Sequence, residues 1–288
     1  MSNRGLWLTA VSGVVLIATA MADSRFPIEH RETIQRSLPT PAGADAVLEV
    51  SNISGGIDVT GSDEKTIELV AERTIRARTD RDRDEARREV RLDTRETSSG
   101  VLLCEDAGRR CGCDERPSSS WRDRDESRYR VDTHFTLRVP RDIAVRLCSI
   151  NGGHITVMHT TGGVEVEHVN GGIDVDDIRG AAHLTTVNGA IHATYPGAPP
   201  ASSFRTVNGS IVASFPKSLS ADMRLRTMNG GLFTDFETTA LPRTAATPER
   251  RGNRFVYRSN RTVSVRVGGG GPELSFETLN GDVRVLQH

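Results

Sequence analysis

Apolar and polar residues alternate in short stretches through the second half of the chain, and an Asn-Gly pair lies at the centre of each stretch. An aliphatic residue follows most of these Asn residues at the third position, and β-branched residues are frequent on both sides. Alternation with a period of two is typical of β-strands. The pattern predicts a strand on either side of each pair. The pairs begin at Asn151, Asn170, Asn188, Asn208, Asn229 and Asn280.

Equivalent positions around successive Asn residues carry similar side chains, which bears on how the strands pair. In an antiparallel meander, for which Asn-Gly is a strong hairpin signal, equivalent residues of successive repeats are not neighbours. In a parallel solenoid each residue lies on its counterpart about 4.8 Å away, so columns of like residues are favoured. We therefore favour an all-β, β-helix-like parallel solenoid. It places Asn170, Asn188, Asn208 and Asn229 in one corner ladder and Ile173, Ile191, Ile211 and Leu232 in one interior column.

The first half of the chain is less regular, and its pattern predicts strands, one short helix and one hairpin. Charged residues with Asp at the start and no Gly or Pro indicate an exposed helix over Asp80–Glu89. Residues 268–271 form a glycine-rich turn, and Leu241–Asn253 interrupts the repeat. The predicted strands are Val47–Val59, Ile67–Ile75, the hairpin of Val90–Thr94 with Val101–Cys104, and Tyr129–Val139.

The N-terminus has the layout of a cleavable secretory signal. Arg4 precedes an apolar run over Leu6–Ala20, and Ala20-Met21-Ala22 forms an Ala-x-Ala cleavage site. An uncleaved anchor is the alternative, but the apolar run is short for a membrane span. We predict a signal peptide at 1–22, an N-terminal extension at 23–46, and a single β-domain at 47–288 with an irregular charged insertion at about 76–128.

Composition narrows the function classes. The formal net charge is -1, so the chain as a whole favours neither nucleic acid nor anionic lipid as a partner. Aromatic residues make up 5% and the chain has 27 Gly, which suits a fold of turns and thin cores better than a large globular enzyme.

Four cysteines, Cys104, Cys111, Cys113 and Cys148, predict disulfides if the chain is exported. A bond from Cys104 to Cys111 or to Cys113 would close the loop between them covalently. A bond between Cys111 and Cys113 is disfavoured, because one intervening residue strains the geometry. A zinc site built from all four is the alternative, but Cys-x-Cys fits the usual ligand spacing poorly.

Outward-facing positions carry the candidate chemistry, and their residue types are mixed. The acidic cluster Glu165, Glu167, His168, Asp174, Asp176 and Asp177 resembles the carboxylates that solenoid polysaccharide lyases and hydrolases use as acid, base or calcium ligands. A solvated acidic edge is the simpler interpretation. A metal site is the second possibility, from His154, His159, His168, His183 and His192, but no pair has a fixed ligand spacing. We predict no catalytic, cofactor or metal residue.

The repeats resemble those of a bacterial "putative-adhesin" family of unknown function, related to head-GIN adhesin domains. The resemblance rests on the string 205–211, Arg-Thr-Val-Asn-Gly-Ser-Ile, with its copies, and on the ending Gly270–Val283. It covers roughly Val47 to Leu286 and is weaker before Tyr129. The resemblance implies a right-handed parallel β-solenoid in the cell envelope, with no catalytic motif to transfer.

Two classes of function remain. The first is an exported, non-catalytic, adhesin-like or envelope-stress-associated scaffold. It would lie in the periplasm or at the cell surface and bind an envelope protein or glycan through a solenoid face. The alternative is a carbohydrate-active solenoid enzyme, a polysaccharide lyase or hydrolase.

Overall fold

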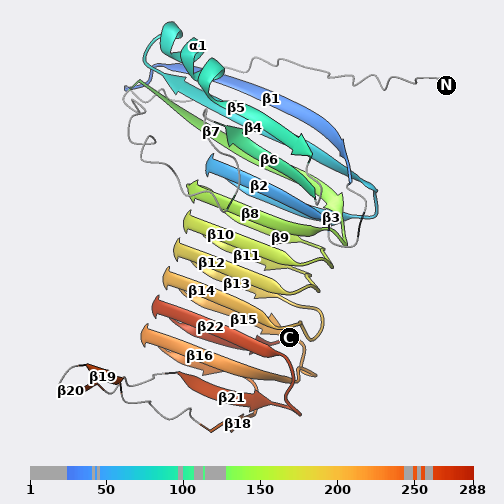
Figure 1. The fold of residues 1–288 in the computed structure, drawn as a ribbon, viewed down its shortest axis with the longest axis vertical. Helices are drawn as coiled ribbons and strands as arrows, with labels where there is room; N and C mark the ends of the chain where they lie inside the picture. Colours follow the sequence, from blue (N-terminus) through green and yellow to red (C-terminus); the bar gives the residue numbers. More distant parts are fainter. Residues whose placement is uncertain are drawn as a thin grey trace.

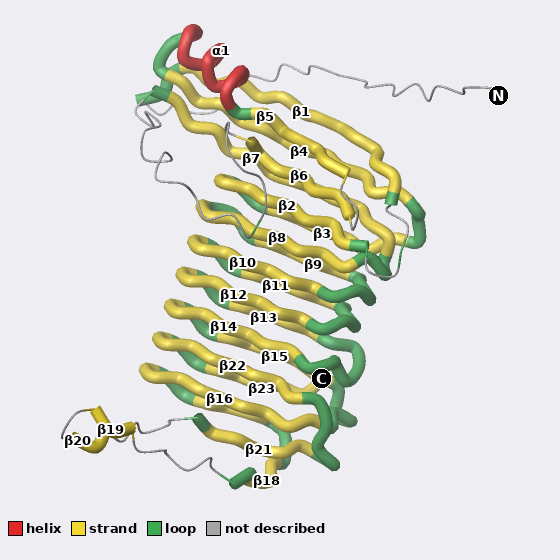
Figure 2. The backbone as a smooth tube through the Cα atoms, viewed as in Figure 1, coloured by secondary structure: helices red, strands yellow, loops and turns green. Residues whose placement is uncertain are grey.

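The computed structural model describes residues 25–40, 43, 46–96, 100–106, 113, 128–242, 249–251, 254–256 and 262–288. The expected signal peptide at 1–22, Cys111 and most of the interruption at 241–253 lie outside the described residues. Within the described part, the chain is almost wholly β (Figures 1 and 2). Two mixed sheets contain nearly all the strands, and a single short helix lies at one end of the stack.

Each of the two sheets is a continuous run of hydrogen-bonded strands whose spatial order differs from their order in the chain. The first contains β1 (Ile28–Pro39), β4 (Thr66–Ala77), β7 (Tyr129–Pro140), β3 (Ile57–Ser62), β9 (Ile155–Met158), β11 (Ile173–Asp176), β13 (Ile191–Thr194), β15 (Ile211–Phe215), β23 (Val283–Gln287) and β17 (Leu232–Thr234). The second contains β18 (Thr238–Ala240), β21 (Val263–Val267), β16 (Ala221–Asn229), β22 (Glu273–Asn280), β14 (Ser202–Asn208), β12 (Ala182–Asn188), β10 (Val164–Asn170), β8 (Ala144–Asn151), β2 (Val47–Ser54), β6 (Gly100–Asp106) and β5 (Arg91–Glu96). A separate hairpin pairs β19 (Glu249–Arg251) with β20 (Arg254–Val256).

The repeats form rungs, each with one strand in either sheet. β8 continues into β9, β10 into β11, β12 into β13 and β14 into β15 across the Asn-Gly pairs. Neighbouring rungs run parallel, and Asn188 lies beside Asn208 where β12 pairs with β14. The antiparallel meander is therefore excluded for these strands. Like residues lie on like residues, as the columns in the sequence indicated.

The order of the rungs differs from the order in the sequence. The last rung, β22 with β23, lies between the β14–β15 rung and the β16–β17 rung (Figure 1). Asn208 therefore neighbours Asn280 rather than Asn229, and Ile211 neighbours Val283 rather than Leu232. The expected contacts between Asn208 and Asn229 and between Ile211 and Leu232 are wrong. All rungs have similar residues at equivalent positions. A rung can therefore pair with any rung whose strand edges are open, and not only with the rung that precedes it in the sequence.

The core lies between the two sheets and consists of aliphatic columns with a few aromatic pairs. Phe204 and Phe276 stack with ring centroids 4.9 Å apart, across the junction with the inserted rung. Tyr195 and Phe215 stack at 5.4 Å near the chain end. These rings are fully buried, so they contribute much of the apolar surface removed from water there.

The first half of the chain follows the sequence pattern, with one omission and one break. The segment Val47–Val59, predicted as strand, is divided between β2 and β3, which lie in different sheets. The helix α1 spans Asp80–Glu89 as predicted, and the Thr79 side chain accepts a hydrogen bond from the Asp82 N–H at its start. The β5–β6 hairpin and the strand β7 are also confirmed. The strand β1 was not predicted. It forms the edge of the first sheet by antiparallel pairing with β4, inside the segment expected to be an extension.

The sequence predicted a disulfide from Cys104 to either Cys111 or Cys113, and the structure contradicts the second of these pairings. Cys113 is bonded to Cys148 on β8, with Cα atoms 5.6 Å apart. The alternative of a Cys104–Cys113 bond is therefore wrong. Cys104 is itself disulfide-bonded, while Cys111, its other expected partner, lies outside the described residues. Cys148 faces outward from its strand, so the bond holds Cys113 at the outer face of the second sheet.

None of the helices in the described ranges combines the length and the apolar character that a membrane crossing requires.

Glycine is required at the Asn188-Gly189 and Asn208-Gly209 corners because of a close approach between rungs. A hairpin turn of type I′ needs positive φ at both central residues, but neither Asn188 nor Gly189 has one. A Cβ at Gly189 would lie 2.0 Å from the carbonyl oxygen of Gly171, and one at Gly209 would lie 1.9 Å from that of Gly189. Each glycine therefore lets its backbone contact the corner of the next rung.

We expect Gly189→Ala to lower the free energy of unfolding by about 1–3 kcal/mol, as overpacking does in rigid interiors. Gly197→Ala is the matched control, because a Cβ there meets no atom within 4 Å. Its effect should stay within about 0.5 kcal/mol. Urea unfolding of both variants measures the difference. An equal effect of the two changes would contradict the close-approach explanation.

Candidate binding surface at the Asn corner

The strand that leads into each Asn has an unusual distribution of polar and apolar side chains. The residue two positions before the Asn points inward and is polar, as at Thr186, Thr206 and Thr278, each at most 2% exposed. The residue one position before points outward and is aliphatic, as at Val187 and Leu279, which are 37% and 38% exposed. Buried polar and exposed apolar side chains are the informative exceptions to ordinary burial.

The buried threonines have a structural task. The Thr186 hydroxyl donates to the Gly171 carbonyl at 2.9 Å, and the Thr206 hydroxyl donates to the Gly189 carbonyl at 2.8 Å. Thr278 and Thr227 make the same bond to Gly209 and Gly281. A carbonyl at a tight corner has no strand partner on that side, so an inward hydroxyl satisfies it.

The Asn side chains form a continuous hydrogen-bonded ladder along the corner. The Asn188 amide nitrogen donates to the Asn170 side-chain oxygen at 2.9 Å, and Asn208 donates to Asn188 at 2.8 Å. The inserted rung completes the ladder, because Asn280 donates to Asn208 and Asn229 donates to Asn280, both at 2.7 Å. We call the whole set the Asn ladder: Asn151, Asn170, Asn188, Asn208, Asn280 and Asn229.

An aliphatic column runs beside the Asn ladder on the outer surface. Val169 is 38% exposed, Met228 is 46% exposed, and Ile150 and Val207 are half-buried. The register of the rungs puts these side chains in one line along the stack. We call this line the aliphatic ridge: Ile150, Val169, Val187, Val207, Leu279 and Met228.

Charges beside the aliphatic ridge largely neutralise one another. Glu277 lies between Arg205, at 2.8 Å, and Arg226, at 2.9 Å, on three adjacent rungs. On the far side of the corner, hydrogen bonds from the Gly231 N–H and from Arg284 lower the pKa of the Asp282 carboxyl. The surface therefore offers apolar side chains and amides, bordered by paired ions.

The structure does not bring the acidic cluster together. Glu165 and Glu167 lie on β10 in the second sheet, whereas Asp174 and Asp176 lie on β11 in the first sheet. Asp177 follows at the opposite corner, with a φ of 48°. The carboxylates thus occupy different faces of the stack, and no shared acid–base pair results from their spacing in sequence.

The histidines are also dispersed. His168 is buried at 3% exposure and occupies the position of the corner threonines, where its Nδ1 lies 2.9 Å from the Ser149 carbonyl. His154 and His192 contact the Asp174 carboxylate from either side, at 2.9 and 2.7 Å. His159 pairs with Asp177, and His183 bonds with Ser203. Within the described ranges, no three His, Cys, Asp or Glu side chains are placed to hold a metal ion.

Sequence reasoning missed the aliphatic ridge. We expected the aliphatic columns to point inward and looked for a site only among the mixed polar residues at the outward-facing positions. The alternation of side chains between the two faces of a strand would have revealed the ridge. Leu184 and Thr186 share the inner face, so Val187 must share the outer face with Thr185.

The sequence matches no protein-family model and no curated protein. Among solved structures, a "putative cell adhesion protein" of Clostridium sporogenes aligns over 90% of this chain and 100% of its own, at 10% identity and a TM-score of 0.46. A "putative adhesin" of Bacteroides fragilis covers 89% of this chain and 97% of its own, at 10% identity and 0.30. A "putative lipid binding protein" of Parabacteroides distasonis covers 90% and 96%, at 11% identity and 0.29.

Proposed function

We propose that this chain is an exported, non-catalytic protein of a bacterial envelope, an adhesin-like or envelope-stress-associated scaffold that binds a partner along the aliphatic ridge. The observation that carries the proposal is the exposure of aliphatic side chains in one continuous line. Contiguous exposed apolar surface is uncommon on monomeric proteins and marks interaction sites.

Strand propensity alone does not account for the aliphatic ridge. Thr is as good a strand former as Val and would keep the outer position polar. Leu279 and Met228 are not β-branched, yet they occupy the same outward position and are 38% and 46% exposed. The corner threonines are needed inside for their hydrogen bonds, whereas no hydrogen bond or buried position among the described residues calls for an aliphatic side chain at Val187 or Leu279. A partner that covers the ridge supplies the reason.

A protein surface fits the ridge better than a glycan does. The ridge carries no aromatic side chain on which a sugar ring could stack, and its flanking ions are already paired. Apolar side chains bordered by polar groups match the apolar core and polar rim of a protein interface. The partner we propose is therefore another protein of the envelope.

The remaining parts of the proposal concern location and architecture. A disulfide at Cys113–Cys148 supports an oxidising compartment, and the predicted leader at 1–22 supports export. We infer that residues 47–288, with β1 added as an edge strand, form one solenoid domain whose coil is right-handed, as parallel crossovers generally are. Membership of the "putative-adhesin" family belongs to the same proposal and rests on the repeats.

We expect a ridge variant with Val169→Ser, Val187→Ser and Leu279→Ser to lose at least tenfold in retention on envelope preparations of the source bacterium. Loss of exposed apolar contact at three positions along the ridge reduces affinity by at least this factor. The measurement is co-sedimentation of the purified mature chain, with circular dichroism to confirm that the variant folds.

The control carries Val212→Ser, Phe233→Ser and Val263→Ser, which remove apolar groups away from the ridge. It should be retained like the wild type. Equal retention of the ridge variant would refute the proposed site. Cleavage of polyuronates or other glycans by the wild-type chain would instead favour the carbohydrate-active enzyme.

A further inference from the structure

The helix α1 covers the end of the stack over β4 and β7 (Figure 1). Its sequence alternates acidic and basic residues. Acidic side chains face the start of β7: Arg128 donates to Glu85 at 2.8 and 3.0 Å, and the Tyr129 hydroxyl donates to Glu89. Arginines are left on the opposite side. Glu85 and Glu89 are thus paired with residues at the start of β7, whereas Asp80 and Asp84 lie on the exposed side and pair with Arg83.

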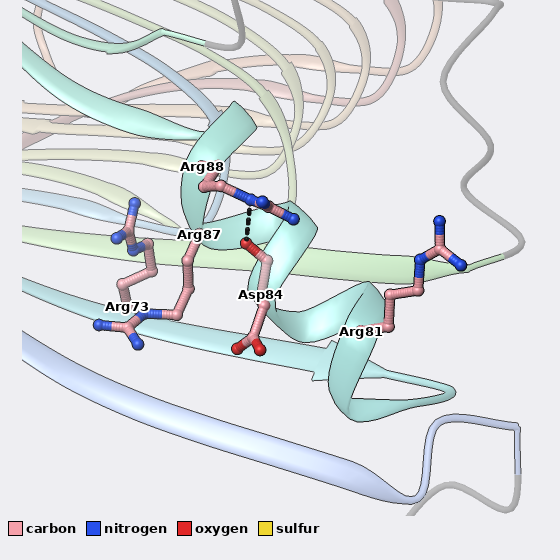
Figure 3. A pocket seen from close by; sticks show the side chains of 5 residues that line it. All are labelled: Arg73, Arg81, Asp84, Arg87 and Arg88. Carbon is pink, nitrogen blue, oxygen red and sulfur yellow. Dashed lines mark hydrogen bonds between the residues drawn. The ribbon is translucent and has the colours of Figure 1, made fainter.

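The arginines border an open pocket of about 720 Å³, lined by Arg73, Arg81, Asp84, Arg87 and Arg88 (Figure 3). Arg73 and Arg87 meet at one end, where both contact Glu32. Asp84 and Arg88 lie between them and Arg81 in the view of Figure 3. Four guanidinium groups therefore line one pocket, with Asp84 among them and Glu32 at one end, and we call it the arginine pocket.

The carboxylates nearby are already engaged. Asp84 accepts two hydrogen bonds from Arg83, at 2.9 and 3.0 Å. The Arg88 Nε–H donates a hydrogen bond to the Asp84 backbone carbonyl at 3.2 Å. Arg81 has no ion pair within the described part of the chain. The pocket thus keeps a surplus of positive charge that the fold does not use.

Arg73 at the inner end of the pocket is nearly fully buried, at 8% exposure. It donates to the Val90 carbonyl at 2.6 Å and to Glu32, while its Nε has no hydrogen-bond partner among the described residues. A buried guanidinium costs desolvation energy, so it is kept only where its charge is used.

Helix stability explains only part of this arrangement. Arg87 and Arg88 lie in the last turn of α1, where cations interact favourably with the helix macrodipole. Arg81 lies in the first turn, where the macrodipole disfavours a cation, and Arg73 belongs to β4. Arg73 is held by Glu32 and the Val90 carbonyl, so Arg81, which neither the macrodipole nor an ion pair explains, is the residue that points to a ligand.

We propose that the arginine pocket binds an extended chain bearing several phosphate groups. Guanidinium groups bind phosphate oxygens in a bidentate manner and keep their charge at all physiological pH values. Because the arginines are spread along the pocket, successive phosphates of one chain can each meet a different arginine. A single phosphate reaches only one end.

Calorimetry of the mature chain with sodium tripolyphosphate and with inorganic phosphate, at fixed ionic strength, tests the proposal. We expect tripolyphosphate to bind at least tenfold more tightly than phosphate. In the Arg81→Gln/Arg88→Gln variant the Kd for tripolyphosphate should rise at least tenfold, toward that of phosphate. Both side chains lie on exposed helix positions, so the fold is kept.

The control variant, Arg138→Gln/Arg224→Gln, removes the same charge from exposed strand positions far from the helix. Its Kd should match that of the wild type. An equal loss in the control would mean diffuse attraction to the whole surface and would overturn the proposal. Failure of tripolyphosphate to bind, or tighter binding of dextran sulfate of equal charge, would overturn it as well.

Discussion

Removal of residues 273–288 should abolish the cooperative unfolding transition of this protein. The deleted segment forms β22 and β23, which pair on both sides with other rungs. Leu274, Phe276, Val283 and Val285 are 0% exposed. Burial of four such side chains contributes roughly 6–12 kcal/mol, comparable with the whole stability of a domain. The open strand edges left behind should also promote aggregation.

A smaller change in the same strand tests the same packing without deletion. Phe276→Ala should lower the free energy of unfolding by about 3–5 kcal/mol, because it removes the ring that stacks on Phe204. Leu279→Ala is its control on the outer face and should cost about 0.5 kcal/mol or less. Guanidinium unfolding of the two variants gives the comparison.

The position of the inserted rung can be verified by engineered disulfides. Ser203 and Ser275 are directly paired across β14 and β22, whereas Ser203 and Arg224 are two strands apart. Strands lie about 4.8 Å apart, and a disulfide requires Cα atoms within about 7 Å. Ser203→Cys with Ser275→Cys should crosslink, and Ser203→Cys with Arg224→Cys should not. The reverse result would mean that the rungs are stacked in the order of the sequence. The large effect expected from removal of residues 273–288 would then have no structural reason.

Ile211→Asp should destabilise the protein by about 4 kcal/mol or more, because it buries an unpaired carboxylate. Ile211 is 0% exposed and lies between Ile191 and Val283 in the interior column. Neither neighbour offers a hydrogen-bond partner. The expected observation is a large fall in the urea midpoint or loss of the folded protein.

Val212→Asp is the matched control on the adjacent outward position. Its neighbours across the strands are His192 and Arg284, beside which a carboxylate is tolerated. The change should cost less than about 0.5 kcal/mol. His192→Asp would be a poorer control, because it would replace the contact between His192 and Asp174, at 2.7 Å, with two neighbouring carboxylates. Similar losses at 211 and 212 would contradict the assignment of inner and outer faces.

Local features of the sequence predicted local features of the structure. The charged run at Asp80–Glu89 became α1, and the hairpin and β7 lie where the pattern placed them. These elements depend on propensity, capping and alternation, all of which act between near neighbours in the chain. The strand β1 was missed because charged residues obscure its apolar alternation, and pairing with β4 stabilises it instead.

The candidate sites depended more on tertiary structure. Val187 and its equivalents were visible as a column, but their outward direction followed only from the burial of the corner threonines. The arginine pocket joins Arg73 on β4 with residues of α1, so its charge is invisible in an overall net charge of -1. Conversely, the acidic cluster was contiguous in sequence and became divided between two sheets.

By itself the sequence determined that the chain forms stacked β-rungs, because repeated columns of Asn, Gly, Thr and aliphatic residues are stable only where like lies on like. It could not determine which rung lies beside which. Every rung presents nearly the same strand edge, so the pairing energies of the alternative neighbours are nearly equal. Which rungs become neighbours therefore depends on how the chain connects rungs that are far apart in the sequence. Only the tertiary structure decided that β22 and β23 enter between two earlier rungs, that Cys113 bonds to Cys148, and that four arginines share one pocket.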